Sequence, residues 1–375
     1  MIPDLRARLK AAANKPKAAE VPCRCLAVEE RTPLSRLGAL SRVTPQGVRR
    51  LGLDLPSFDP ARALFLDTET TGLRGAGTVA FLVGLGWLEG EDFVVRQLLM
   101  RDYPEEAHLL EQVADALERF DCVVSFNGKS FDLPLLKDRF TMARLRGRWR
   151  ELPQLDLLHA ARRTWKLRLG ACTLCALEEK VLGTPRADDL PSAQVPERYF
   201  QYIKCRDLSL LDGVLRHNAQ DIRTLCALLF RLSDIYERPE EQTSMLDVFS
   251  VGRALERCGD GEAARRCFQV ASVSELSQRA RLELARSYRR ERDYARAAQA
   301  YKSMIARGEG GAGAYTQLAI LLERRLLDPC AALDITEKAL WRFSGGDFLH
   351  RVGPETLHAL ERRRARLKRI VSKQG

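Results

Sequence analysis

Hydrophobic and polar positions follow three successive patterns along the chain. Residues 1–60 are basic and punctuated by prolines, without sustained periodicity, and are expected to form an N-terminal extension. Between residues 61 and 237, short apolar runs alternate with amphipathic segments, which predicts an α/β domain. Residues 240–375 show only helical periodicity, so an all-α domain is expected at the C-terminus.

The α/β domain opens with strands. The apolar run Ala63–Leu66 ends at Asp67, as expected for a short buried strand, and two further strands are predicted over 78–88 and 93–100. The pattern then predicts, in order, a helix over 104–120, a strand over 122–126, a helix over 131–140 and helices over most of 157–235. Strands followed by a β-α-β unit indicate a mixed sheet.

The C-terminal domain shows self-similarity at a spacing of about 34 residues. Segment 283–285 recurs as 317–319, and Ala263 recurs at Ala297. Each unit has a turn that ends in an aspartate, at Asp260, Asp293 and Asp328. The pattern resembles three degenerate tetratricopeptide repeats, which present a surface to a peptide or another protein. A helical bundle without repeats stays open as the alternative.

The charge of the chain indicates the class of partner. The formal net charge is +11, and part of the excess is local, in segments 144–150 and 162–168. Such a surface favours a polyanion, because each neutralised phosphate releases counterions, although a solvated basic face is the alternative. No run approaches the roughly 18 apolar residues of a spanning helix, and no apolar stretch follows the basic N-terminus. We expect a cytoplasmic protein with no membrane partner.

Two acidic residues follow the first predicted strand. Asp67 and Glu69 stand at positions i and i+2, so their side chains point to the same side at the C-terminal end of the strand. Adjacent carboxylates repel each other unless a cation holds them, and hard oxygen ligands suit Mg²⁺ or Mn²⁺. The pair alone is weak support for a metal site, because surface strands also carry it by chance.

Further candidates lie later in the α/β domain. Asp132 stands where a buried strand ends and a helix begins, a position that also suits the helix dipole. His217 and Asp221 are four residues apart on a predicted helix and share one face, although a structural His–Asp pair is the alternative. Asp156 is expected to order the fold rather than to bind metal.

Taken together, these residues closely resemble the DEDD exonuclease superfamily, and in particular the bacterial YprB-like ribonuclease-H-like family. The resemblance covers about residues 50–235 and includes the segments 65–73, 80–86, 126–132 and 155–159. It implies a ribonuclease-H-like mixed five-stranded sheet flanked by helices. It also implies a metal-dependent 3′→5′ exonuclease that hydrolyses phosphodiester bonds of DNA or RNA from a single-stranded 3′ end.

The resemblance assigns a role to each candidate residue. Asp67, Glu69, Asp132 and Asp221 would hold two Mg²⁺ or Mn²⁺ ions for a two-metal mechanism. His217 is the candidate general base, but it departs from the family pattern. The histidine-type subfamily places its histidine five residues before the last aspartate, and the tyrosine-type places a tyrosine four before; this chain has histidine at the tyrosine spacing.

The resemblance also predicts substrate contacts. The loop residues Thr70, Thr71, Gly72 and Leu73 are expected to border the terminal nucleotide. Asn127 and Lys129 are expected to contact the strand. Phe131 is expected in the core, with contact to the strand as the alternative. Two other functions stay open: an RNase-H-like endonuclease with a related acid cluster, and a non-catalytic scaffold that binds nucleic acid or protein.

Overall fold

The computed structural model describes residues 24–38, 43–52, 58–72, 77–186, 190–344 and 352–373. Over these residues the chain divides into two compact units. The first unit falls within Met1–Val43, Leu55–Leu158 and Thr173–Arg231, and the second within Thr44–Asp54, His159–Cys172 and Leu232–Gly375. The predicted domain bounds stay a prediction.

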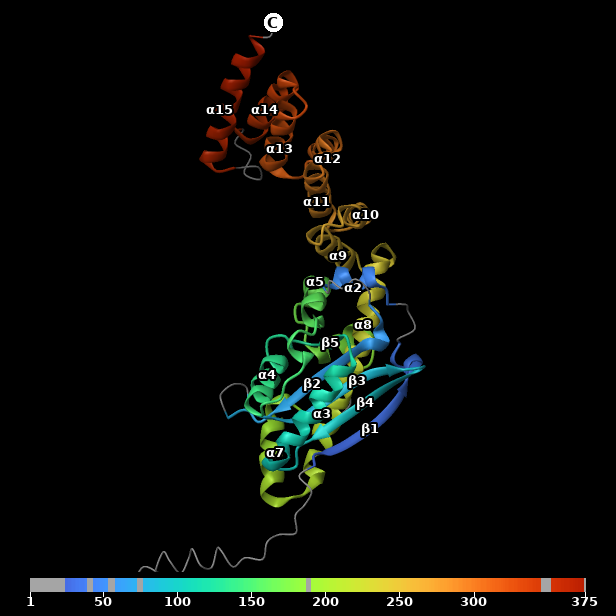
Figure 1. Cartoon of the computed structure of the whole chain (residues 1–375). Coiled ribbons are helices and arrows are strands. Elements are labelled where there is room, and N and C mark those ends of the chain that lie inside the picture. The colour runs from blue at the N-terminus through green and yellow to red at the C-terminus, as the bar shows by residue number, and fades with distance from the viewer. Residues whose placement is uncertain are drawn as a thin grey trace, which may run out of the picture. The chain divides into compact units, whose positions relative to one another are not determined.

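The first unit is built on a mixed sheet. Among the described residues the sheet has six strands in the order β1-β4-β3-β2-β5-β6 (Figure 1). β2 pairs in parallel with β5, and β5 with β6, whereas the other neighbours are antiparallel. The strands are β1 (Leu26–Pro33), β2 (Ala63–Thr70), β3 (Ala80–Glu89), β4 (Asp92–Leu99), β5 (Cys122–Ser125) and β6 (Gln154–Asp156). The predicted fold class is confirmed.

The described sheet has one strand more than the five predicted. The additional strand is β1, which lies in the predicted N-terminal extension and pairs with β4 along its whole length. Its central residues Glu29, Glu30 and Arg31 are charged, so no apolar run indicates a strand in the sequence. Backbone hydrogen bonds to the neighbouring strand hold such an edge strand, and its outer faces tolerate charge.

Helices flank the sheet (Figure 1). A hydrophobic core joins the strands to α3, α4, α7 and the start of α8. Phe81 of β3 stacks on Tyr199 of α7, with ring centroids 4.0 Å apart, so the core fixes the strand beside β2. The helical elements are α3 (Glu106–Arg119), α4 (Asp132–Met142), α6 (Leu174–Leu177), the π-helical turn η5 (Glu178–Leu182), α7 (Val195–Cys205) and α8 (Asp212–Glu237).

Two glycines of β3 let α8 approach the sheet closely. A Cβ atom at Gly84 would stand 2.4 Å from Asn218 Oδ1, and one at Gly86 would stand 2.5 Å from Ile222 Cγ2. A side chain at either position would therefore push α8 outward. The close packing brings Asn218 within hydrogen-bonding distance of Asp67 on β2.

The second unit is helical. Its helices are α2 (Pro45–Leu51), most of α5 (Leu157–Leu169), α9 (Met245–Arg257), α10 (Gly261–Ala271), α11 (Ser277–Arg290), α12 (Tyr294–Ala306), α13 (Gly311–Arg324), α14 (Pro329–Ser344) and α15 (Pro354–Val371). The predicted all-helical C-terminal region is confirmed. None of the helices in the described part of the chain is long and apolar enough to cross a membrane.

Turns of one kind recur in this unit. Gly259, Arg292 and Leu327 each have a positive φ, of 84°, 63° and 55°. Each precedes an aspartate whose carboxylate accepts a hydrogen bond from a backbone N–H in the first turn of the next helix. These are the turns that the repeat pattern predicted, but the tetratricopeptide assignment and a protein partner for it stay predictions.

Candidate active site

The first two acidic residues lie where β2 leaves the core. Ala63 to Leu66 are buried, whereas the strand is partly exposed from Asp67 to Thr70. Alternate residues of a strand point to one face, so Asp67 and Glu69 project together. β2 pairs in parallel with β5, and Asp132 begins the helix that follows β5. The carboxyl ends of the two strands therefore bring these three acids to one edge.

Electrostatic interactions show that the fourth acid joins them. Burial raises the pKa of Asp67 well above its usual value, and the charges of Asp221, Asp132 and Glu69 raise it further. Asp221 comes from α8, far along the chain from β2. The structure thus brings the four predicted carboxylates together, from β2, α4 and α8.

All four carboxyl groups resist ionisation. Burial raises the pKa of Glu69 to about 8, against the opposing charge of His217. It raises that of Asp132 to about 6, although a hydrogen bond from the Thr68 hydroxyl favours the charged form. Burial also raises the pKa of Asp221, against the charges of His217 and Arg186. The metal-free site therefore favours protonated carboxyl groups, and a cation in place of those protons would stabilise the charged carboxylates.

The donor set suits a hard divalent cation, because carboxylate oxygens are the ligands that Mg²⁺ and Mn²⁺ prefer. In the described part of the chain, no three His, Cys, Asp or Glu side chains stand in the arrangement of a formed metal site. Several carboxylate oxygens are instead engaged by protein donors. Asp67 accepts from Asn218, Asp132 from Thr68 and Asp221 from Arg186.

Asn218 is a site residue to which sequence analysis assigned no role. It is fully buried, and its Nδ2 donates to Asp67 Oδ2 at 3.0 Å. Its Oδ1 accepts from Gln97 Nε2 at 3.0 Å, and the same Gln97 nitrogen donates to Leu215 O at 2.8 Å. This chain of hydrogen bonds orients the Asp67 carboxylate. The position of Asn218 between His217 and Asp221 on one helix was the sequence feature that could have indicated its role.

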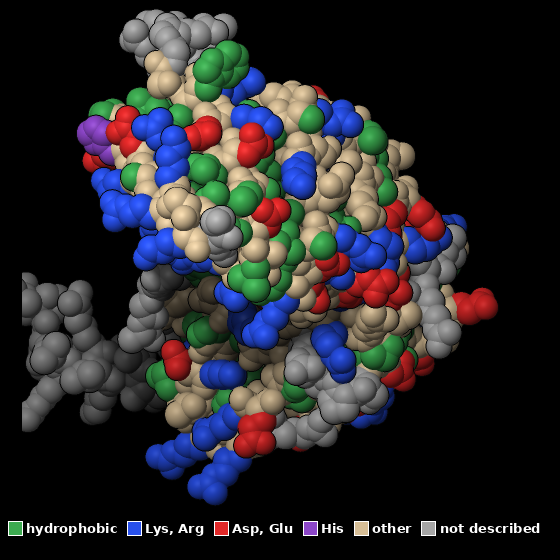
Figure 2. Space-filling model, turned by 90° about the horizontal axis from the view of Figure 1, so that it is seen from above, with side chains coloured by type: hydrophobic (Ala, Val, Ile, Leu, Met, Phe, Trp, Pro, Cys, Tyr) green, Lys and Arg blue, Asp and Glu red, His purple; other side chains and the backbone are tan. Residues whose placement is uncertain are grey.

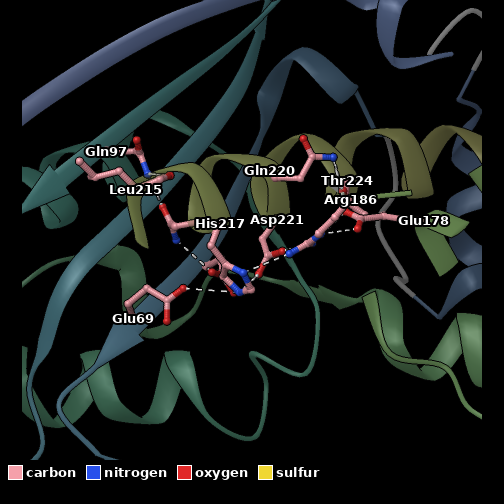
Figure 3. Close-up of polar contacts among 11 residues, drawn as sticks. Glu69, Gln97, Glu178, Arg186, Leu215, His217, Gln220, Asp221 and Thr224 are labelled. Atoms are coloured by element: carbon pink, nitrogen blue, oxygen red, sulfur yellow. Dashed lines mark hydrogen bonds and ion pairs between the residues drawn. The ribbon is translucent and has the colours of Figure 1, made fainter. Parts of the chain in front are cut away.

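His217 lies between Glu69 and Asp221 (Figure 3). Its Nε2 is 3.4 Å from Asp221 Oδ2 and 3.9 Å from Glu69 Oε1. On the other side of the ring, Arg186 Nη1 lies 3.2 Å from Nδ1. A guanidinium only donates, so Nδ1 accepts this hydrogen bond and the neutral ring carries its hydrogen on Nε2. In this arrangement His217 presents a donor to the carboxylates.

Arg186 is a second residue that sequence analysis missed. It forms ion pairs with Glu178 and Asp221, and Figure 3 shows its guanidinium between them. Glu178 is fully buried at the start of the π-helical turn and also accepts from the Thr224 hydroxyl. Buried charge persists only when it is paired and hydrogen-bonded, so Glu178 holds Arg186 in place. No sequence signal pointed to the pair, because Glu178 falls in a segment typical of an ordinary amphipathic helix.

A cleft of about 890 Å³ borders the carboxylates. Glu69, Asp132, Thr70 and Gly72 line it. Phe131, expected in the core, is 41% exposed and also lines the cleft, because it immediately precedes α4 at the mouth of the site. That expectation was wrong.

The predicted substrate loop is partly described. Thr70 Oγ1 donates to Gly72 O at 2.7 Å, and Thr71 Oγ1 accepts from Val79 N at 3.1 Å. Both contacts hold the turn after β2 in shape. Leu73, predicted to border the nucleotide, lies outside the described residues.

Asn127 and Lys129 form the turn between β5 and α4. Asn127 has a φ of 66°, and its backbone N–H donates to Asp156 Oδ1 at 2.8 Å. The Lys129 N–H lies 3.4 Å from the other oxygen of Asp156. Asp156 therefore orders this turn, as expected. Two residues of this turn, Ser130 and Phe131, are among the described residues that line the cleft.

The basic segments are used in different ways. Arg144, Arg146 and Arg150 are exposed in the first unit. In the second unit, Arg163 donates to Leu51 O at 2.7 Å and Arg168 pairs with Asp247 at 2.9 Å. On the face drawn in Figure 2, Lys and Arg side chains are interleaved with acidic ones. On this face the positive charge is therefore not one uniform field.

Comparison with known proteins agrees with this arrangement. Residues 64–233 match the model of a family described as the RNase_H superfamily. These residues form a ribonuclease-H-like domain. The match spans the sheet from β2 to β6 and nearly all of α8, and so includes the four carboxylates. A ribonuclease-H-like domain supports nuclease activity, nucleic acid as the ligand and the use of divalent metal ions.

A curated relative of this chain is the Bacillus subtilis (strain 168) protein named "Uncharacterized protein YprB". It is 36% identical over 185 residues, which are 48% of this chain and 44% of the relative. The predicted resemblance is confirmed, over less than half the length of that relative. A family B DNA polymerase from the archaeon Pyrobaculum calidifontis is also similar. It is 16% identical, with a TM-score of 0.38 over 59% of this chain and 29% of the polymerase.

Proposed function

We propose that this protein is a metal-dependent 3′→5′ exonuclease acting on single-stranded DNA or RNA ends. The convergence of four carboxylates from three elements, beside an open cleft, carries the proposal. Such a cluster is costly in a resting protein, because each charge raises the pKa of its neighbours. Cations bound for nuclease chemistry would offset this cost, and so would explain the cluster.

Asp67, Glu69, Asp132 and Asp221 would hold two Mg²⁺ or Mn²⁺ ions. When bound, such ions supply an activated water and stabilise the leaving oxygen in phosphodiester hydrolysis. The protein's part is to orient these ligands. Asn218 fixes one oxygen of Asp67, and Thr68 fixes one of Asp132. Phe131 and Gly72 give the terminal nucleotide a partly apolar wall.

The contact between Arg186 and His217 limits when His217 can act as the predicted general base. With Nδ1 occupied as an acceptor, the Nε2 of neutral His217 already carries a hydrogen and cannot take one from water. For His217 to act as general base, Arg186 must first release Nδ1, so that the hydrogen moves there. Otherwise His217 serves as a donor that orients Glu69 and Asp221.

The test is cleavage of 5′-labelled single-stranded DNA and RNA with Mg²⁺, Mn²⁺ or EDTA. We expect a metal-dependent ladder that shortens from the 3′ end. Asp67→Ala and Asp221→Ala should each reduce the rate about a hundredfold or more, because each removes ligands worth several kcal/mol of charge stabilisation. Asp115→Ala, at an exposed position of α3, is the matched control and should keep full activity.

Other outcomes assign other functions. Internal cuts would favour an endonuclease. Absence of cleavage on every substrate, with nucleic-acid binding intact in wild type and variants alike, would favour the non-catalytic scaffold.

A further inference from the structure

A second cavity, of about 810 Å³, borders α8 in the first unit. Its lining contains five arginines, namely Arg36, Arg186, Arg216, Arg223 and Arg231, and we call it the arginine groove. Among the described residues of this lining, Glu30 is the sole carboxylate. Two of the five already pair with carboxylates, Arg186 with Glu178 and Asp221 and Arg223 with Glu30. The concave surface still presents more guanidinium groups than these carboxylates, which favours an anionic ligand.

The arginines of α8 follow the helical repeat. Arg216, Arg223 and Arg231 are separated by seven and eight residues, so they lie along one face of the helix. At 1.5 Å per residue, the stripe is roughly 22 Å long. Arg216 and Arg231 are exposed, and Arg223 pairs with Glu30 of β1. A row of this length fits an extended polyanion better than a single small anion.

The groove complements the carboxylate cleft. The described residues that line the cleft include Glu69, Asp132 and Asp138 but no lysine or arginine. A nucleic-acid strand whose end lies in that cleft therefore finds few protein cations there. Phosphate contacts supply most of the affinity of non-specific nucleic-acid binding, so they must come from another surface.

The groove and the cleft meet at His217. This residue lines the groove, and its Nε2 lies 3.9 Å from Glu69, which lines the cleft. Arg186 also lines the groove and pairs with Asp221. The groove and the cleft are thus neighbouring surfaces, with the largely buried side chains of His217 and Arg186 between them.

We propose that the arginine groove binds the phosphates of the nucleic-acid strand upstream of the 3′ end held at the carboxylates. The inference rests on the proposed function and names the path of its substrate. Guanidinium groups bind phosphate oxygens with two parallel hydrogen bonds, and the spacing along α8 presents them one after another. A bound phosphate replaces Glu30 as the partner of Arg223.

The experiment measures binding separately from cleavage. Fluorescence anisotropy of a labelled single-stranded oligonucleotide, as DNA and as RNA, is recorded in EDTA over a range of salt. The test protein is the full chain carrying Arg216→Gln, Arg223→Gln and Arg231→Gln together. The control is Arg62→Gln, another surface arginine of the first unit in an ion pair with an acidic partner, Asp121. Arg186 is left intact because it contacts Asp221.

We expect the triple variant to bind the oligonucleotide at least tenfold more weakly, with Arg62→Gln unchanged. The slope of log affinity against log salt should fall by roughly 0.7 for each phosphate that the variant no longer neutralises. Circular dichroism checks folding, and photo-crosslinking of the oligonucleotide to α8 in wild type gives a second measurement. Equal affinity and slope in wild type and triple variant, without crosslinks to α8, would overturn the proposal.

A mononucleotide probe tests whether the groove binds the phosphates of the strand or the phosphate of a released product. If the triple variant loses mononucleotide binding and keeps oligonucleotide binding, the groove holds released product and the strand path is wrong. The outcome is independent of the exonuclease proposal. Binding that depends on the groove, with no cleavage by wild type, would leave the groove standing and refute the nuclease.

Discussion

Burial decides the chemistry of single side chains in this site. Glu69 and Asp132 are ordinary carboxylates in sequence, yet the pKa of Glu69 rises to about 8 and that of Asp132 to about 6 when they are packed with other acids. His217 is likewise set by its surroundings, because Arg186 decides which ring nitrogen accepts. The identity of a residue gives the donor atoms, and its neighbours give their protonation.

Glu69 gives a prediction for stability against pH. The folded metal-free protein keeps a proton on Glu69 that the unfolded chain releases above pH 4.5, so stability should fall as pH rises from 4.5 to about 8. One proton contributes a slope of at most about 1.4 kcal/mol per pH unit. Melting temperatures in EDTA across this range test the slope. Glu69→Gln should reduce it, while Asp67, Asp132 and Asp221, whose pKa values are also raised, keep their part of it. Glu111→Gln, at an exposed position of α3, should not reduce it. A slope unchanged in Glu69→Gln would contradict the prediction.

Packing between elements decides which residues reach the site. α8 supplies His217, Asn218 and Asp221, and it can do so only because Gly84 and Gly86 leave room for it on β3. The turn between β5 and α4 depends in the same way on Asp156, which binds the backbone of Asn127. α8 is distant from β3 in sequence, and Asp156 is distant from the turn that it holds. Contacts between elements therefore position the carboxylates.

Gly84→Ala tests the packing of α8. The new Cβ would stand 2.4 Å from Asn218 Oδ1, so the helix must shift or Asn218 must release Asp67. We expect a loss of about 1–3 kcal/mol in the free energy of unfolding, as for overpacking elsewhere. Cleavage should slow as well. Gly213→Ala, on α8 itself, meets nothing nearer than 3.8 Å and is the control. If Gly84→Ala kept wild-type stability and activity, Asn218 and α8 would accommodate the added Cβ at no cost, and the prediction would be wrong.

At the scale of the whole molecule, charge links metal binding to folding. A cation that binds only the folded state stabilises it, by about 2.7 kcal/mol at a hundred times its dissociation constant. We therefore expect Mn²⁺ to raise the melting temperature of wild type and EDTA to reverse the rise. Asp67→Asn should lose most of the Mn²⁺ effect, yet in EDTA it should be at least as stable as wild type, because burial already disfavours the charged form of Asp67. An equal Mn²⁺ shift in both proteins would place the cation elsewhere.

The sequence by itself determined the elements and the chemical candidates. Short apolar runs and helical periodicity predicted the α/β fold and the helical C-terminal region, because these signals are local. The four carboxylates were assigned as a set through the resemblance to the DEDD superfamily. Sequence analysis missed β1, whose charged residues hide an edge strand held by backbone hydrogen bonds. It also placed Phe131 in the core, since hydrophobicity does not reveal which side of a turn a side chain takes.

Only the tertiary structure decided what surrounds those candidates. The contacts of Asn218 with Asp67 and of Arg186 with Asp221 span 151 and 35 residues of sequence, which no local pattern encodes. The arginines of α8 become a groove only when β1 and the segment that carries Arg186 lie beside them. Electrostatic interaction falls with distance in space rather than along the chain, and so the protonation of the site was settled by folding.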